Sequence, residues 1–486
     1  MTVKPASWMA ASLCLAALAG CVVGPNYHQP STPPPPAAFK ELPPPNPPNG
    51  NWKQAQPSDA QDPQLKGTWW ELYNDPQLNA LEEKIAVSNQ TLKAQLEQYF
   101  EAREQVRIAR SSYYPTLGAG PSISRNRVSD NEPQIVGRSA VFQYNTFTLE
   151  GQASWEPDLW GSVRRSVEAA RANAQASAAD LANVALSLQG ALATDYFELR
   201  GLDLQQQLLD NTVKADADFL RLTQIRFQGG VATDVDVAQA ETQLETVKAQ
   251  AIDVGVARGQ FEHAIATLIG QSASTFSLAP APLTLALPVI PAGVPSELLE
   301  RRPDIAAAER RADAANAQIG IAVAAYYPNV QIGGTGGFQS GNPGTWVQGP
   351  SALWSLGGSA VETLFDAGRR HAITDQARDA YEAQTANYRQ SVLNAFQEVE
   401  DNLAALRILS DESQTQSAAV NAARRSLQIS TRRYKGGVTT YLEVLTAQTT
   451  QLTDERTQDD ITTRQFAASV QLIEALGGGW NRTQLP

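Results

Sequence analysis

A segment built around two adjacent glycines occurs twice in this chain and constrains its fold more than any other feature. The first copy runs from Arg226 to Val237, and the second runs from Arg433 to Val444, 207 residues further on. Glycine ends a helix readily, because it adopts positive φ angles without steric cost. Each copy is therefore predicted to be the end of a long antiparallel helical hairpin.

The segments beside these glycine pairs have the composition of very long helices. No proline lies between residues 157 and 280, and residues 369–435 contain neither glycine nor proline. Apolar residues, mostly alanine, recur every three or four positions in the first of these segments, which is typical of a packed helix. A helix from about Ser162 to Gln228 would be roughly 100 Å long, at 1.5 Å per residue. Return helices are predicted to end near Ile269 and Leu476.

Each half of the chain also contains a Tyr-Tyr-Pro stop followed by alternating sequence. The stops are at residues 113–115 and 326–328. Apolar residues on one face of the clearest alternating run are Phe147, Leu149, Gly151, Ala153 and Trp155. A period of two with one apolar face predicts strands between two media. Two interpretations remain at this point, a half-buried sheet of a soluble protein and the strands of a membrane barrel.

The repeat divides the chain into six predicted segments. They are a signal peptide at 1–20, a proline-rich arm at 21–77, a first repeat at 78–270 with strands at about 116–126 and 140–156 and a hairpin end at 229–231, a linker at 271–296, a second repeat at 297–476 with strands at about 329–338 and 352–365 and a hairpin end at 436–438, and a C-terminal tail at 477–486. The fold class is mainly α with a small β part.

The N-terminus carries the features of an export signal. A short apolar run ends in small residues directly before Cys21, and it is too short to span a bilayer as a helix. This pattern resembles the lipobox of bacterial lipoproteins, in which Cys21 would become the lipidated first residue. The alternative is a plain signal peptide with a chance cysteine. Val22 follows Cys21 where inner-membrane lipoproteins often carry Asp, so the resemblance favours the outer membrane.

Composition argues against several classes of function. The net charge of −12 and the pI near 4.9 disfavour nucleic-acid binding. The three histidines are isolated, and no metal-ligand spacing, nucleophile elbow or phosphate loop occurs. We therefore expect no enzymatic activity, no metal and no cofactor.

The strand count indicates an oligomer if the strands cross a membrane. Four strands cannot close a barrel in one chain, because about eight are the smallest number in bacterial examples. Open sheet edges in lipid would leave backbone groups without hydrogen bonds. Three chains would together supply 12 strands, so the barrel interpretation predicts a homotrimer.

Several motifs together resemble the TolC-like outer-membrane efflux channels, and the lipoprotein branch called NodT or OprM-like is the most similar. They are the lipobox with residues 22–27, the two Tyr-Tyr-Pro stops, residues 364–369 and the two hairpin ends. The resemblance covers nearly the whole mature chain. It implies a homotrimer with a 12-stranded barrel in outer-membrane lipid and a long periplasmic α-helical barrel. It also implies small-molecule export together with a periplasmic adaptor and an inner-membrane pump.

The resemblance also assigns residues at the hairpin ends. The adaptor contacts would be Gly229, Gly230, Val231, Gly436, Gly437 and Val438. Asp236 and Glu443 would form acidic rings in the trimer, and Leu442 matches an apolar constriction. Thr446 stands where the branch often carries Asp, which puts a further acidic ring in doubt.

Arg433 and Tyr434 resemble residues that tie neighbouring helices at the periplasmic gate. Simpler roles remain open for all of these residues. The glycines could serve the turns alone, and the two acids could be solvated helix residues.

Two other functions are compatible with parts of the sequence. One is an outer-membrane duct for type I protein secretion, although the lipobox favours small-molecule efflux. The other is a periplasmic coiled-coil scaffold without a pore. The amphipathic strands argue against a scaffold, which would have no use for an apolar strand face.

Overall fold

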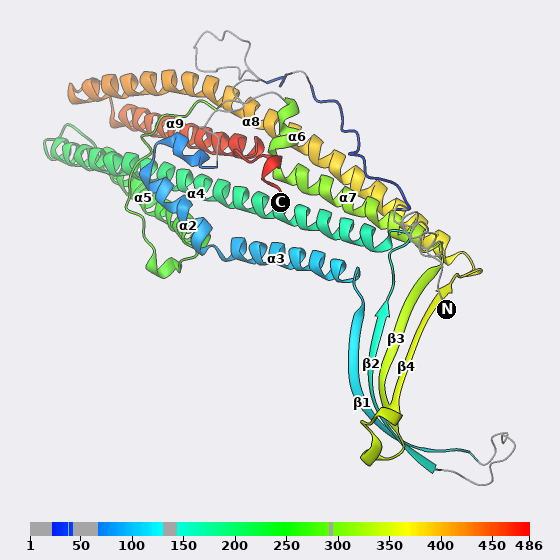
Figure 1. Ribbon diagram of the computed structural model, residues 1–486. Coiled ribbons are helices and arrows are strands. Elements are labelled where there is room, and N and C mark those ends of the chain that lie inside the picture. Colours follow the sequence, from blue (N-terminus) through cyan, green and yellow to red (C-terminus); the bar gives the residue numbers. More distant parts are fainter. Residues whose placement is uncertain (1–21, 37, 42–66, 130–142, 291–294) are drawn as a thin grey trace. The chain divides into compact units, whose positions relative to one another are not determined.

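The computed structural model describes residues 22–36, 38–41, 67–129, 143–290 and 295–486. Within them, helices and strands follow the same order twice (Figure 1). The first repeat contains α2 (Pro76–Ser88), α3 (Gln90–Ser111), β1 (Thr116–Arg127), β2 (Gln143–Trp155), α4 (Ser162–Gln228) and α5 (Asp234–Leu268). The second contains α6 (Leu298–Arg301), α7 (Pro303–Ala324), β3 (Asn329–Ser340), β4 (Ala352–Val361), α8 (Arg369–Lys435) and α9 (Tyr441–Ala475). The predicted pair of long helical hairpins is confirmed: α4 and α8 have 67 residues each, and α5 and α9 have 35 each.

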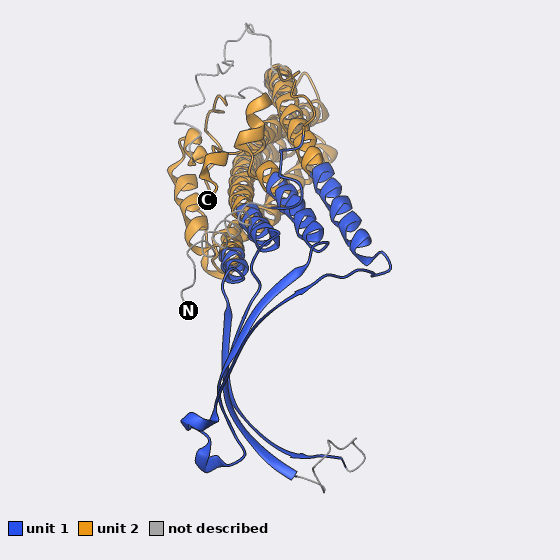
Figure 2. Cartoon of the chain, turned by 45° about the vertical axis from the view of Figure 1, so that its right-hand side comes forward, with its two compact units in different colours: residues 1–30, 100–176, 308–387 blue, residues 31–99, 177–307, 388–486 orange. Residues whose placement is uncertain are grey.

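The chain divides into two compact units, which Figure 2 shows in different colours. The sheet unit comprises residues 1–30, 100–176 and 308–387, and the hairpin unit comprises residues 31–99, 177–307 and 388–486. All four strands belong to the sheet unit. Both hairpin ends belong to the hairpin unit.

The helix predicted to run from Leu78 to about Ser111 is broken at Asn89. The Asn89 side chain accepts a hydrogen bond from the backbone nitrogen of Leu92 at 2.8 Å and donates one to the carbonyl of Leu268 at 2.7 Å. Asn89 therefore closes α2 and starts α3 with extended backbone angles. A contact with a residue far along the chain makes this break, which local sequence does not reveal.

A second predicted helix, from Leu298 to Ala325, is also two helices. Arg302 separates α6 from α7 and is extended, with φ −100° and ψ 124°. The next residue is Pro303, whose ring disfavours helical angles at the residue before it. The break follows from this proline.

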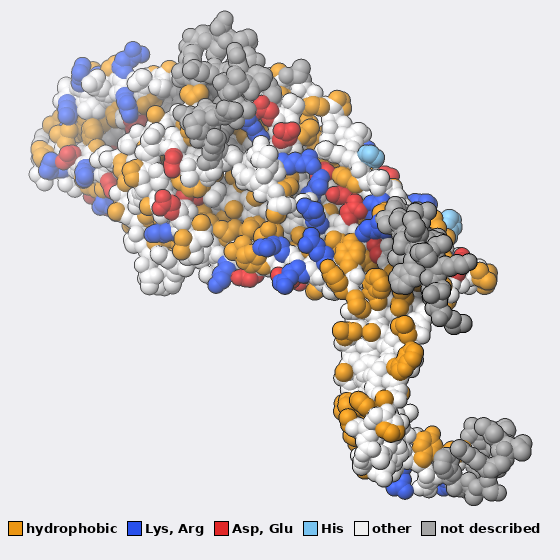
Figure 3. Space-filling view, viewed as in Figure 1, with side chains coloured by type: hydrophobic (Ala, Val, Ile, Leu, Met, Phe, Trp, Pro, Cys, Tyr) orange, Lys and Arg blue, Asp and Glu red, His pale blue; other side chains and the backbone are white. Residues whose placement is uncertain are grey.

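The four strands form one antiparallel sheet in the order β1-β2-β3-β4. Every residue of β1 is exposed, and the exposed apolar side chains of the sheet include Leu117, Ile123, Trp354 and Leu356. Figure 3 shows hydrophobic side chains on the surface of these strands. Within the described residues nothing buries either face of β1, in contrast to the half-buried sheet of a soluble protein.

The last strand is shorter than predicted, because β4 ends at Val361 rather than near residue 365. Val361 pairs with Asn329, the first residue of β3, and the residue before it is Pro328, which has no N–H to donate. Leu364 and Phe365 follow the sheet and are highly exposed.

The pairing of β2 with β3 joins the two repeats within the sheet. Gly151 lies opposite Gly336, 185 residues later in the chain. A Cβ atom at Gly337 would collide with the backbone carbonyl of Leu149, so this seam between the repeats requires glycine. Strand pairing within each repeat spans far shorter stretches, at most 38 residues for β1 with β2.

The hairpin unit has an extensive hydrophobic core. Its aromatic centre consists of Trp69, Tyr73, Tyr196, Phe197 and Phe466, all nearly or completely buried. The rings of Phe197 and Phe466 lie 4.8 Å apart, and those of Tyr73 and Phe197 lie 4.7 Å apart. This cluster anchors α4 and α9 to each other and to the segment before α2.

Candidate functional site: the two hairpin ends

The two glycine turns have nearly the same backbone geometry. We call residues 223–240 the first hairpin end and residues 430–447 the second hairpin end. Gly230 has φ +70° and Gly437 has φ +72°. Val231 N donates to the carbonyl of Arg226 at 2.8 Å, and Val438 N donates to that of Arg433 at 2.9 Å. Glycine at these two positions satisfies the left-handed backbone of a helix C-cap.

The turn residues are accessible at both ends. Val231 is 66% exposed and Val438 is 70% exposed, and all four glycines are exposed. A Cβ atom added at Gly230 would meet no atom within 4 Å, so its φ angle alone requires glycine. The apolar surface of the two valines is therefore free to meet another molecule as far as the described residues extend.

Asp236 closes a capping box at the start of α5. The Thr233 hydroxyl accepts from Asp236 N at 3.3 Å, and the Asp236 carboxylate accepts from Thr233 N at 2.8 Å. Two backbone donors of the first turn are satisfied in this way. This arrangement supports the simpler, structural role that the sequence left open for Asp236.

Glu443 occupies the equivalent position in α9 but does not complete such a box. The side chain of Thr440 makes no capping hydrogen bond. Glu443 instead lies 3.6 Å from Arg433, and both side chains are about half exposed. An exposed ion pair of this length contributes little to stability.

Two tyrosines form the packed centre of the second hairpin end. Tyr434 and Tyr441 are 2% and 0% exposed, and their rings lie 5.8 Å apart in an edge-on contact. The Tyr434 hydroxyl lies 3.1 Å from that of Thr223 in α4. Tyr434 thus connects α8 with α4, in agreement with a tying role for it. Tyr434 and Arg433, expected together in that role, face different partners.

Leu442 and Thr446 border a groove on the surface of the second hairpin end. The groove has a volume of about 400 Å³ and is lined by Ala423, Ser426, Ser430, Leu442, Glu443, Thr446, Ala447 and Thr450. Leu442 is 54% exposed. The Thr446 hydroxyl donates to the carbonyl of Leu442 at 2.9 Å, so it is satisfied within its own helix. Leu442 and Glu443 are therefore brought together at one accessible surface.

Arg226 is a residue of the first hairpin end that sequence reasoning did not single out. Its guanidinium donates to the carbonyls of Tyr434 at 2.9 Å and Lys435 at 3.3 Å. The same group lies 4.6 Å from the centre of the Tyr434 ring. The only available signal was its equivalence to Arg433 in the repeat, and that equivalence does not distinguish their different contacts.

Asp216 is a second residue that the sequence did not reveal. It is 1% exposed in α4, and its carboxylate accepts from the side-chain nitrogen of Gln448 at 2.9 Å. Burial raises the pKa of Asp216 to about 6, and a hydrogen bond with Gln243 acts against this rise. A negative charge is therefore held at a cost beneath the second hairpin end at neutral pH.

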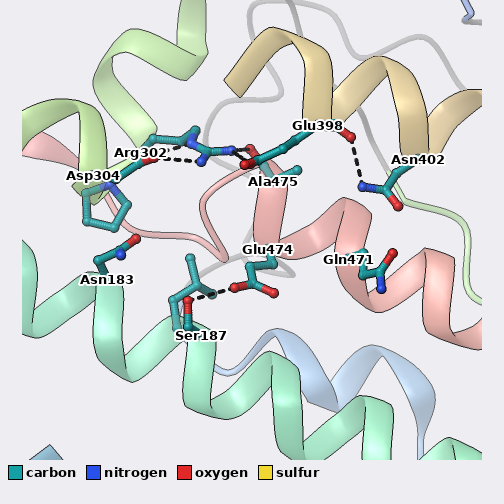
Figure 4. Close-up of a pocket in the computed structure, with 11 residues that line it drawn as sticks. Asn183, Ser187, Arg302, Asp304, Glu398, Asn402, Gln471, Glu474 and Ala475 are labelled. Carbon is teal, nitrogen blue, oxygen red and sulfur yellow. Dashed lines mark hydrogen bonds and ion pairs between the residues drawn. The ribbon is translucent and has the colours of Figure 1, made fainter. Parts of the chain in front are cut away.

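A separate polar pocket of about 410 Å³ lies elsewhere in the hairpin unit (Figure 4). Arg302 donates to Glu398 at 2.6 Å and to the carbonyl of Ala475 at 3.0 Å. Ser187 donates to Glu474 at 2.8 Å, while burial raises the pKa of Glu474. The charged groups of this pocket pair with one another, as in a structural joint between α4, α8 and α9.

Other expectations fall outside these ends. Cys21, the signal peptide and most of the proline-rich arm lie outside the described residues, as do residues 140–142 of the predicted second strand. Across the described ranges, no helix combines the length and apolar character needed to cross a membrane. The same ranges contain no cluster of three or more His, Cys, Asp or Glu side chains suited to a metal ion.

Comparison with known proteins places this architecture in a family. The sequence matches the model of the outer membrane efflux protein family over residues 81–271 and 294–478. It is 31% identical over 492 residues to the outer membrane protein OprJ of Pseudomonas aeruginosa, covering 98% of this chain and 97% of OprJ. It is 30% identical over 413 residues to the probable efflux pump outer membrane protein TtgC of Pseudomonas putida, covering 85% of each.

A solved structure agrees with these relatives. The outer-membrane channel OprN superposes with a TM-score of 0.86 at 28% identity, covering 95% of this chain and 100% of that one. The family match spans most of both repeats and includes both hairpin ends. The chain belongs to the outer membrane efflux protein family.

Proposed function

We propose that this protein is the outer-membrane exit duct of a tripartite efflux system for small molecules. The observation that carries the proposal is the four-stranded sheet with exposed apolar side chains, attached to two long helical hairpins in a member of this family. A relative named for an efflux pump and a relative solved as an outer-membrane channel support it. Drugs and other toxic compounds are the proposed cargo class.

The working assembly in this proposal is a homotrimer. Three copies of a four-stranded sheet supply 12 strands, which close into a barrel and leave no edge in lipid. The helical hairpins would form the periplasmic α-helical barrel. A lipid chain on Cys21 would add an anchor in the outer membrane, contributing about 0.8 kcal/mol for each buried CH₂.

The hairpin ends are the proposed docking points for a periplasmic adaptor, which would connect the duct to an inner-membrane pump. The accessible turns Gly229–Val231 and Gly436–Val438 support this assignment, because they expose backbone and valine side chains together. The docking role goes beyond the backbone requirement that already explains the glycines.

The gate is proposed to lie at the same ends. Asp236 and Glu443 would each form a ring of three carboxylates in the trimer, which would attract cations. Leu442 would narrow the pore beside Glu443, and Thr446 would leave one ring position uncharged. Arg433 and Tyr434 would stabilise the closed arrangement through the contacts described above.

The native mass of the protein, extracted gently from outer membranes, tests the assembly. We expect a particle of about three times the chain mass that inserts into planar bilayers as a channel. The double variant Leu442→Ala with Glu443→Ala should raise single-channel conductance. A monomer would contradict the duct, because four strands cannot close a barrel, and would favour the coiled-coil scaffold.

A Cys21→Ser variant separates the anchor from the barrel. Under the proposal it stays in the membrane fraction, because the strands hold it there. Deletion of residues 143–155 should abolish insertion even with Cys21 intact. Release of Cys21→Ser into the soluble fraction would contradict a membrane barrel.

A further inference from the structure

One cationic side chain crosses from the first hairpin end to the second. Arg226 belongs to the last turn of α4, and its two carbonyl partners, Tyr434 and Lys435, are the last two residues of α8. Its guanidinium also stacks on the Tyr434 ring, and a Cβ atom at Gly437 would lie 3.9 Å from its Nη2 atom. One side chain therefore touches the helix end, the aromatic core and the glycine turn of the other hairpin.

The chemistry of this contact suits arginine in particular. The last four carbonyls of a helix have no partner within the helix, and the helix dipole gives that end a partial negative charge. A guanidinium satisfies two carbonyls through separate N–H groups while its flat face lies on an aromatic ring. A lysine ammonium would keep the charge but not this combination of directions.

The contact has no counterpart in the reverse direction. Arg433 is the repeat equivalent of Arg226, yet it faces Glu443 within its own hairpin at 3.6 Å. Both Arg433 and Glu443 are about half exposed, whereas the Arg226 contact ends on the buried ring of Tyr434. The first hairpin end therefore holds the second one, and not the other way round.

We propose that Arg226 is the positioning residue that latches the second hairpin end in its closed arrangement. The inference rests on the proposed duct and gate, and it moves the tie from Arg433 to Arg226. The latch acts on backbone carbonyls, so side-chain substitutions in α8 do not remove its two hydrogen bonds. Opening of the gate must break both bonds and the ring contact before α8 and α9 can move away from α4.

The test compares Arg226→Ala with Arg221→Ala in the full-length protein. Arg221 lies in the same helix and forms only an exposed pair with Asp218 at 2.8 Å, so its removal is a matched loss of charge. Hydrogen–deuterium exchange of peptides from residues 430–447 reports local opening, and planar-bilayer recording reports conductance. Arg226→Ala should raise exchange there at least tenfold and conductance at least twofold, while Arg221→Ala stays within twofold of wild type in both.

Arg226→Lys keeps the charge and provides a second variant if Arg226→Ala fails to assemble. We expect exchange in residues 430–447 to remain at least fivefold above wild type, since one ammonium cannot reproduce the fork and the stacking. Wild-type exchange in Arg226→Lys would overturn the latch, as would equal exchange in Arg226→Ala and Arg221→Ala. Absence of any channel in wild type would instead overturn the proposed duct, because the exchange comparison does not depend on a pore.

Discussion

The return helix of the first hairpin begins with Asp234, an exposed acid, whereas that of the second begins with Tyr441, which is completely buried. The glycine turns before these residues are almost the same in φ angle and hydrogen bonding. The repeat has therefore preserved what the backbone of a turn requires. The side chains around the turn have diverged in how they stabilise it.

The difference lies in where each end obtains its stability. The first end is stabilised by its own capping box between Thr233 and Asp236. The second lacks a side-chain cap and depends on Tyr434, on Tyr441 and on Arg226 from the other hairpin. An end that depends on contacts from outside can be released by breaking those contacts, which suits a moving part of a gate.

The largest expected effect comes from exchanging the first residue of each return helix for alanine. Tyr441→Ala removes a buried ring and should lower the stability of the second hairpin end by about 3 kcal/mol. Asp234→Ala removes an exposed side chain and should change the first end by less than about 0.5 kcal/mol. Hydrogen exchange of the two end peptides measures both. Equal losses would mean that the two ends do not differ as described.

A pH effect of intermediate size is expected from Asp216, which is packed with Gln448 and Gln243 and near Tyr441. Its pKa is about 6 in the folded protein against an ordinary value of 3.8, so the folded state binds more protons between these values. The free energy of unfolding therefore falls as pH rises through this window. The penalty is complete above it and absent below about pH 4.

Asp216→Asn should remove this penalty while keeping the acceptor for Gln448. We expect a gain in stability of about 2 kcal/mol at pH 7.5 and almost none at pH 4. Urea unfolding followed by circular dichroism at both pH values measures the gain. Asp218→Asn is the control, because Asp218 is exposed in the same helix. An equal gain at both pH values would argue against a titrating buried charge.

The smallest expected effect concerns the helix caps. Thr233→Ala should cost the first hairpin end about 1 kcal/mol, because it opens the capping box. Thr440→Ala should cost the second end only a few tenths, since Thr440 makes no side-chain cap. Exchange of the amides in the first turns of α5 and α9 distinguishes the two. A larger loss for Thr440→Ala would reverse the comparison.

The helices were predictable because their signals are local. The absence of glycine and proline from residues 369–435 is sufficient to predict α8, and the glycine pairs mark both turns. The break at Asn89 was not predictable, because it depends on a hydrogen bond to Leu268. Proline accounts for the break at Arg302, so that boundary was readable from the sequence in principle.

The contacts at the hairpin ends were less accessible to sequence reasoning. Arg226 and Arg433 occupy equivalent positions, and only packing sends one to backbone carbonyls and the other to Glu443. Likewise Thr233 and Thr440 precede an acid at the same spacing, yet only one pair closes a capping box. Repeat equivalence predicts the backbone well and the side-chain partners poorly.

The seam between β2 and β3 bears on the order in which the chain can fold. Pairing of β1 with β2, or of β3 with β4, can begin as soon as one repeat has been synthesised, because few residues separate the partners. The seam must wait for the second repeat, since Gly151 and Gly336 are 185 residues apart and closing so long a loop costs more entropy. Its stability comes from strand pairing rather than from the covalent linker. Two half-length fragments, synthesised separately, could therefore complement one another along this seam.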